Sequence, residues 1–313
     1  MPVLIGRHEE DDRAHGLLVT PSDGVRWKLD PEEENRITLL GRGAELTLYL
    51  LGGPKPENVY ARLADLTGHH PMPPQWALGL RRSAVDTEED DVEYHTYRAS
   101  RHAALPLDGI HRSGPLHTRL DETSEEPSDF REALASGRLH LTVPHTREEP
   151  SHRSESPDGP VRTQIERGAD GFHLTAPFAP TEEVRSVFHA CRRAESVRPM
   201  LTTSGTGPGG HRYAGTWLGR SIEDESDLAD RIDRCLSLSA SGQVMVGFNP
   251  HPREPSRDQL LLDALRAAIA MPLLWTAPTS AGGLLGLTGG SEPTIRAYRR
   301  ALHLRYKILP YLY

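Results

Sequence analysis

Four histidines stand where short apolar segments of the sequence end, and they are the first candidates for chemistry. They are His111, His145, His173 and His251. Imidazole nitrogens are common Zn²⁺ ligands, so three or four of them at one edge of a sheet would support a metal-dependent hydrolase. The chain has 16 histidines, however, and no H-x-H or H-E-x-x-H motif accompanies these four, which favours a chance arrangement. We therefore predict no bound metal and no cofactor, and keep a histidine-based metal hydrolase as an alternative.

The segment of residues 168–177, GADGFHLTAP, is the second candidate. Its first residues predict a turn, its apolar residues predict a short buried strand, and its proline predicts an exit into a loop. Side chains two positions apart lie on the same face of a strand, so His173 shares a face with Thr175, as His111 does with Ser113, which predicts that both histidines point into the mouth of a barrel. Thr175 stands at the carboxyl end of this strand, where β/α barrels carry their chemistry. A threonine hydroxyl is a weak nucleophile unless a base activates it.

Short apolar segments that alternate with helical or loop stretches predict the scaffold for these side chains. Six such segments occur, at residues 76–80, 107–111, 139–143, 171–174, 200–203 and 244–248, and helical periodicity marks residues 227–238, 258–270 and 292–308. This alternation is typical of a parallel sheet with helical crossovers. We therefore predict an α/β fold of the (β/α)8 TIM-barrel type that is incomplete, with about six strands. An incomplete barrel exposes sheet edges, so the chain would be a gene fragment, would require a partner chain to complete it, or would be marginally stable.

The amino-terminal part has a different pattern. Alternating apolar residues on both sides of a Gly-Arg-Gly turn at residues 41–43 predict a β-hairpin within residues 37–53, and residues 57–66 have the spacing of a short helix. The proline-rich stretch 69–74 then predicts a stiff, extended linker. We expect two units, a small β module with its linking helix at residues 1–70 and the partial barrel at residues 71–313.

Composition excludes several classes of protein. A net charge of −8 and a pI near 6.1 argue against a nucleic-acid partner, because binding phosphates requires a basic face. Cys191 and Cys235 cannot make a disulfide framework, which predicts a reduced, cytoplasmic protein. No signal peptide and no run of about 18 apolar residues is found, so we expect no membrane association. The acidic, proline-rich stretches 84–98 and 146–161 predict surface loops.

Several blocks of sequence resemble one enzyme family. Residues 66–79, LTGHHPMPPQWALG, are similar to the segment that leads into the barrel of glycoside hydrolase family 31, the α-glucosidases and α-xylosidases. Further blocks match in order: PLD at 106–108, GADGF at 168–172, RPMLT at 198–202, RYAGTWLG at 212–219 and LRYKILPYLY at 304–313. The resemblance covers about residues 37–313. It implies a β-sandwich, of which residues 1–70 would be a remnant, followed by a barrel that cleaves terminal α-linked glucose or xylose.

The resemblance also implies where catalysis would take place. Retaining hydrolysis uses two carboxylates, one as nucleophile and one as acid and base. The family nucleophile is an aspartate two residues after a tryptophan, and here His173 takes the place of the tryptophan and Thr175 that of the aspartate. The acid/base aspartate follows a Trp-x-Gly motif, and here Arg220 takes its place. A guanidinium cannot give up a proton near neutral pH, so the resemblance predicts a catalytically silent family member in which Thr175 and Arg220 mark the lost positions.

The family's sugar-binding positions are also altered. Its aspartate pair after the second strand falls on Ser113 and its neighbours, and its sixth-strand aspartate falls on Asn249, while Arg212 and Trp217 are retained. We take Arg212, Trp217, Ser113 and Asn249 as the substrate-binding candidates, with an α-glucoside or α-xyloside as the expected partner. A non-catalytic carbohydrate-binding or scaffold protein that uses Arg212 and Trp217 is the main alternative. Replacement carboxylates could come only from neighbouring loops, where Glu183, Asp224 and Glu254 are found.

Overall fold

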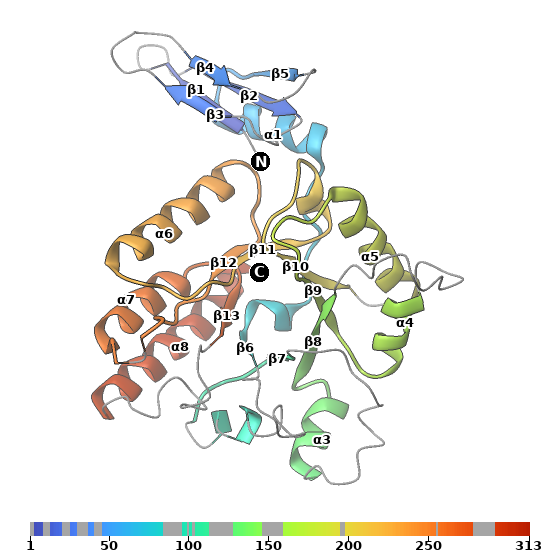
Figure 1. Ribbon diagram of the computed structural model, residues 1–313, viewed down its shortest axis with the longest axis vertical. Coiled ribbons are helices and arrows are strands. Elements are labelled where there is room, and N and C mark those ends of the chain that lie inside the picture. Colours follow the sequence, from blue (N-terminus) through green and yellow to red (C-terminus); the bar gives the residue numbers. More distant parts are fainter. Residues whose placement is uncertain are drawn as a thin grey trace.

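The computed structural model (Figure 1) describes most of the chain. The described residues are 3–8, 13–20, 26–29, 37–40, 46–83, 96–98, 100–101, 104–112, 128–145, 159–194, 198–254, 256–277 and 292–313. Within these ranges, no helix is both long and apolar enough to cross a membrane. Ser113, most of the two predicted surface loops and the turn at residues 41–43 lie outside them.

The larger part of the chain is a barrel of eight parallel strands. In hydrogen-bonding order these are β12 (Val246–Phe248), β11 (Gly215–Leu218), β10 (Met200–Thr203), β9 (Gly171–Leu174), β8 (His140–His145), β7 (Gly109–His111), β6 (Leu80–Ser83) and β13 (Leu274–Thr276). The two ends of this sheet approach each other, because the Leu273 amide donates a 3.0 Å hydrogen bond to the Val246 carbonyl. The barrel is therefore nearly closed.

The prediction of about six strands was wrong, because β11 and β13 were not recognised as strands. β11 follows β10 after a loop that contains only the 3₁₀ turn η2 (Gly210–Arg212). No helical pattern in the sequence therefore separates the two strands. β13 has three residues, as the recognised strands β7 and β12 do, but only three residues separate it from the helix predicted at residues 258–270. Its apolar residues were therefore not distinguished from those of that helix. Since all eight strands come from one chain, the basis for expecting a partner chain to complete the barrel is removed.

Helices surround the barrel (Figure 1). They are α3 (Ser128–Ala135), α4 (Gly159–Glu166), α5 (Thr181–Ala194), α6 (Glu225–Ala240), α7 (Asp258–Ala268) and α8 (Glu292–Leu312). The helices expected near residues 227–238, 258–270 and 292–308 are thus confirmed to within a few residues at their ends. Their apolar faces pack on the outward side chains of the strands: Val184 and Phe188 of α5, for example, join a core with Phe172 and Leu174 of β9.

One buried arginine connects the segments that precede β6 and β13. Arg305 of α8 is inaccessible to solvent and donates five hydrogen bonds of 2.6–3.1 Å to backbone carbonyls. Two of the bonds go to Leu78, before β6, and one each goes to Ile269, Met271 and Pro272, before β13. A planar guanidinium suits this role, since its donors point in several fixed directions. Arg305 therefore ties three segments together that are far apart in sequence.

The amino-terminal module has two small antiparallel sheets. One contains β1 (Val3–Arg7), β2 (Ala14–Thr20) and β5 (Thr47–Gly52), and the other pairs β3 (Arg26–Leu29) with β4 (Ile37–Leu40). The predicted hairpin was wrong, because β5 pairs with β2 and β4 pairs with β3. The predicted short helix is confirmed as α1 (Pro56–Thr67), which buries Val59 and Leu63 against this module. The 3₁₀ turn η1 (Gln75–Leu78) then leads into β6. The strand expected at residues 76–80 was therefore placed too early, since β6 begins only at Leu80.

Candidate functional site in the barrel interior

Alternation along the strands decides which side chains the barrel encloses. Outward positions carry aliphatic and aromatic residues that pack with the helices, such as Leu80, Ile110, Phe172, Leu218 and Leu274. The inward positions towards the carboxyl ends of the strands are polar or aromatic: they are Arg81, Ser83, His111, Thr142, His173, Thr202, Trp217 and Trp275. These inward residues make up the candidate site.

Two stacked tryptophans fill the centre of this site. The rings of Trp217 and Trp275 lie 3.7 Å apart between centroids and are inclined by only 15°. Both indole nitrogens donate hydrogen bonds within the protein. Trp217 Nε1 donates to the Trp275 carbonyl at 3.3 Å, and Trp275 Nε1 donates to the Ser83 hydroxyl at 3.0 Å. Trp217 is 6% exposed and Trp275 1%. The pair is therefore part of the barrel core rather than an open platform for a ligand.

His111 and His173 meet at the edge of the tryptophan pair, as their strand parity predicted. Their ring centroids are 5.7 Å apart, and that of His173 is 5.1 Å from that of Trp275. Burial, and next the charge of Arg81, lower the pKa of His173 to about 4. Burial, and next the neighbouring His173, hold the pKa of His111 well below its usual value. Both imidazoles are therefore neutral at pH 7, and each Nδ1 forms a hydrogen bond with a threonine hydroxyl of the next strand.

Arg81 brings the positive charge of the site. Its guanidinium carbon lies 4.9 Å from the centre of the Trp275 ring, and the residue is 1% exposed. Burial lowers its pKa to about 9, so the side chain stays charged at pH 7. Its Nε and Nη2 atoms are enclosed and have no hydrogen-bond partner. Arg81 and Trp275 were missed in the sequence, although two consecutive arginines directly after the predicted segment 76–80 were a signal that could have singled out Arg81.

The other two histidines do not join this cluster. The His145 ring is 6.3 Å from that of Phe172, which is an outward residue of β9. His251 is buried beyond the end of β12, where burial, followed by the charge of Arg82, lowers its pKa to about 3. In the part of the chain that the structure describes, no group of three or more histidine, cysteine, aspartate or glutamate side chains could hold a metal ion. The four histidines therefore do not converge as the metal-hydrolase alternative requires.

Thr175, at the nucleophile position that the resemblance indicates, lies just beyond the carboxyl end of β9. Its side chain is exposed, and its hydroxyl donates a long 3.5 Å hydrogen bond to the His145 carbonyl. Its amide donates to the same carbonyl at 3.2 Å. A carbonyl oxygen cannot take up the hydroxyl proton, so this contact does not activate Thr175 as a nucleophile.

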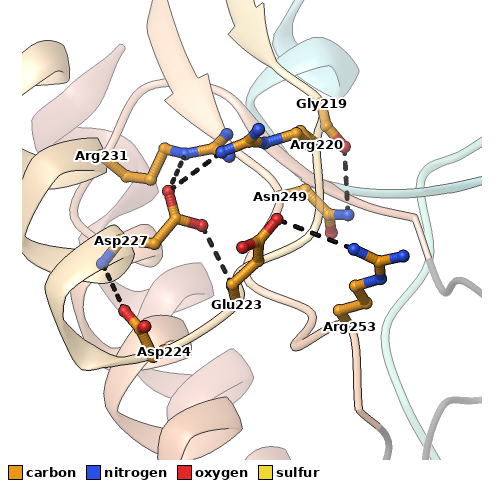
Figure 2. A network of polar contacts seen from close by, with 8 residues as sticks. All are labelled: Gly219, Arg220, Glu223, Asp224, Asp227, Arg231, Asn249 and Arg253. Carbon is orange, nitrogen blue, oxygen red and sulfur yellow. Dashed lines mark hydrogen bonds and ion pairs between the residues drawn. The ribbon is translucent and has the colours of Figure 1, made fainter.

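Arg220, at the acid/base position, turns towards α6 in a network of polar contacts (Figure 2). Its Nη2 lies 3.6 Å from Asp227 Oδ1, which also pairs with Arg231 Nε at 3.2 Å. Asp227 Oδ2 accepts from the Glu223 amide at 3.1 Å. Burial alone would raise the pKa of Asp227, but this hydrogen bond and the two arginines outweigh it and lower the pKa. Arg220, 70% exposed, thus supports the loop after β11.

The three carboxylates considered as replacements also have structural positions. Asp224 begins α6, where its Oδ1 accepts a 2.9 Å hydrogen bond from the Asp227 amide. Glu183 lies in the first turn of α5, and Glu254 is exposed and accepts from the Ser256 hydroxyl at 3.2 Å. Each of the three therefore lies beyond the end of a strand rather than at an inward position of a strand.

Asn249, one of the substrate-binding candidates, has its whole amide group engaged with the protein. Its Nδ2 donates to the carbonyls of Ala277 at 2.8 Å and Gly219 at 3.3 Å, and its Oδ1 accepts from the amides of Ala277 at 3.0 Å and His251 at 3.2 Å. Because Gly219 follows β11 and Ala277 follows β13, Asn249 joins the ends of three neighbouring strands. It closes the barrel at the carboxyl end, as Arg305 does at the other end.

The remaining candidates lie apart from one another in the fold. Arg212 is exposed in η2, before β11, and its aliphatic part packs so closely on Gly68 that a Cβ there would lie 2.2 Å from Arg212 Cδ. Its guanidinium carbon is 5.6 Å from the Tyr213 ring centre. Trp217, in contrast, is enclosed in the barrel. Ser113 lies outside the described residues.

Eight parallel strands with outer helices, and polar residues gathered at the carboxyl ends of the strands, define a TIM-barrel domain. Comparison with family models identifies the family to which this barrel domain belongs. The model described as "Glycosyl hydrolases family 31 TIM-barrel domain" matches residues 148–313, which is more than half of the chain. The chain therefore belongs to glycosyl hydrolase family 31.

Similar proteins support this assignment. "Probable maltase-glucoamylase 2" of Homo sapiens is 34% identical over 103 residues, which are 33% of this chain and 4% of that protein. "Alpha-xylosidase XylQ" of Lactiplantibacillus pentosus is 30% identical over 101 residues, 31% of this chain and 13% of that protein. The chain thus spans only a small part of these curated relatives.

Solved structures agree in fold. The family 31 α-glucosidase of Bacteroides thetaiotaomicron superimposes with a TM-score of 0.81 at 19% identity, over 100% of this chain and 64% of that structure. The cycloalternan-degrading enzyme of Trueperella pyogenes in complex with isomaltose gives a TM-score of 0.74 at 14% identity, over 99% of this chain and 60% of that structure. The chain spans less than two thirds of either structure.

Proposed function

We propose that this chain is a family 31 barrel that descends from α-glucosidases or α-xylosidases and does not hydrolyse α-glycosides by itself. One observation carries the proposal: neither Thr175, just beyond β9, nor Arg220, just beyond β11, is a carboxylate. Thr175 and Arg220 stand where the resemblance places the two catalytic aspartates. Retaining hydrolysis needs two carboxylates about 5–5.5 Å apart in this region.

The loss of reaction rate that we expect without the two carboxylates supports the proposal. Proton transfer by a positioned acid or base contributes about 10² to 10⁴ in rate, and loss of the covalent route adds to that. Among the described residues no base contacts the Thr175 hydroxyl, and Arg220 faces Asp227 at 3.6 Å. A replacement carboxylate would have to be placed to within about 0.5 Å, and Asp224 is already engaged in beginning α6.

Release of nitrophenol from nitrophenyl α-glucoside and α-xyloside tests the proposal. We expect no turnover above buffer from purified chain whose circular dichroism and cooperative unfolding show that it is folded. An active family 31 α-glucosidase assayed in parallel shows that the substrates and conditions are sound. Turnover that disappears in Glu183→Gln or Glu254→Gln would refute the proposal, since it would identify a working replacement carboxylate.

The alternative of a sugar-binding protein without hydrolysis has support in the relatives, because one solved structure contains isomaltose. Titration with isomaltose while tryptophan fluorescence is recorded tests it. A saturable change that is lost in Trp217→Phe and Arg212→Met would favour this alternative. Trp217 is enclosed by Trp275 and offers no open ring face to a sugar, so we expect no fluorescence change at millimolar sugar.

A cytoplasmic location stays a prediction, and the two free cysteines are compatible with it.

A further inference from the structure

Arg81 has an unusual combination of burial and missing partners. Its side chain is fully enclosed in the barrel, yet Nε and Nη2 have no hydrogen-bond acceptor. These two nitrogens lie on one edge of the guanidinium and present two parallel N–H groups. Such a fork matches the two oxygens of a carboxylate, which makes bidentate pairing the strongest interaction that an arginine side chain forms.

Among the residues that the structure describes, none brings a negative charge to this fork. The neighbours of Arg81 are the Trp275 ring at 4.9 Å and the imidazoles of His111 and His173, whose pKa values are lowered. No strand of the described barrel carries a carboxylate that could act as counter-ion. A buried cation without a counter-ion is strongly unfavourable, and a cation–π contact offsets only a part of that cost. The positive charge of Arg81 is therefore balanced only when an anion lies beside it.

We propose that the barrel interior binds the carboxylate group of a small molecule on the Nε–Nη2 edge of Arg81. A carboxylate is favoured over a single-atom anion such as chloride because two parallel donors are free rather than one. Ser83 and His111 are on the same inward face and are only half-buried, so the ligand would enter from the carboxyl ends of the strands. The free carboxylate of a simple acid and that of a sugar acid would make the same contact.

Tryptophan fluorescence reports on this site, because the Trp275 ring lies directly beside the Arg81 guanidinium. We would titrate the chain at pH 7 with sodium acetate and with sodium glucuronate, and keep the ionic strength constant with sodium chloride. The result expected is a saturable fluorescence change with half-saturation on the order of 1–10 mM, together with a rise in the thermal midpoint. Binding of both anions indicates any small carboxylate, and binding of glucuronate alone indicates a sugar acid.

Variants of Arg81 make the test specific. Arg81→Met removes the unpaired charge, so its ligand-free thermal midpoint should equal or exceed that of the wild type, and its response to carboxylate should disappear. Arg81→Lys keeps the charge but loses the fork, and should bind about tenfold more weakly. Arg300→Met, on the exposed face of α8, is the matched control and should respond as the wild type does.

Three results would overturn the proposal. One is the absence of any fluorescence or thermal change up to about 100 mM carboxylate. Another is an equal response to chloride or to neutral glucose, and the third is an unchanged response in Arg81→Met. If Arg81→Met does not fold, Arg81→Lys still decides the matter. Nitrophenyl glycosides are not used here, so hydrolytic silence and carboxylate binding can each fail without the other.

Discussion

Replacing Arg305 by methionine tests whether one side chain holds the barrel closed. Methionine is of similar length and fits an apolar site, so the change removes the five hydrogen bonds without creating a large cavity. Four carbonyls, those of Leu78, Ile269, Met271 and Pro272, lose a charged donor. These carbonyls lie where β6 and β13 begin.

The magnitude follows from these contacts. A hydrogen bond to a charged group contributes at least about 1.5 kcal/mol, so four carbonyls together lose roughly 6 kcal/mol. Removing the guanidinium returns its dehydration cost: burial lowers the pKa of Arg305 to about 10, which corresponds to about 3 kcal/mol. We therefore expect Arg305→Met to lower the free energy of unfolding by about 3 kcal/mol.

Urea unfolding followed by circular dichroism measures this change. For a chain of this size, about 3 kcal/mol should lower the urea midpoint by about 1 M. Arg300→Met, an exposed substitution on the same helix, should stay within about 0.5 kcal/mol of the wild type. A loss in Arg305→Met no larger than in Arg300→Met, or full stability in Arg305→Lys, would refute the idea that the guanidinium joins the strands.

Two further predictions concern buried polar groups. His173 has a pKa of about 4 in the folded chain against the ordinary 6.5, so the unfolded chain binds a proton first and stability should fall by about 3 kcal/mol as pH decreases from 6.5 to 4. Urea midpoints at several pH values measure this, and an undiminished slope in His173→Phe would contradict it. Asn249→Asp should lower stability by about 3 kcal/mol, since the Gly219 and Ala277 carbonyls would face a charge instead of a donor. An unchanged midpoint in Asn249→Asp would show that the amide does not close the barrel.

Features that depend on neighbouring residues could be read from the sequence. The helices α1, α6, α7 and α8 follow from apolar residues at three and four spacing, and five of the eight barrel strands follow from short apolar runs. The family followed from contiguous blocks of residues, and its barrel domain is confirmed over residues 148–313. Strand parity also placed His111 and His173 on a common inward face, where their rings now meet.

The tertiary structure alone decided how distant segments meet. Closure depends on pairs that no local pattern reveals, such as Arg305 with Leu78, 227 positions apart, and Asn249 with Ala277, 28 positions apart. The same holds for the site: Arg81 and Trp275 come from the first and last strands of the barrel and become neighbours only because β6 pairs with β13. Local periodicity determines which residues a strand buries, whereas the fold determines which buried residues face each other. That is why a lost nucleophile position was visible in the sequence and an unpaired buried arginine was not.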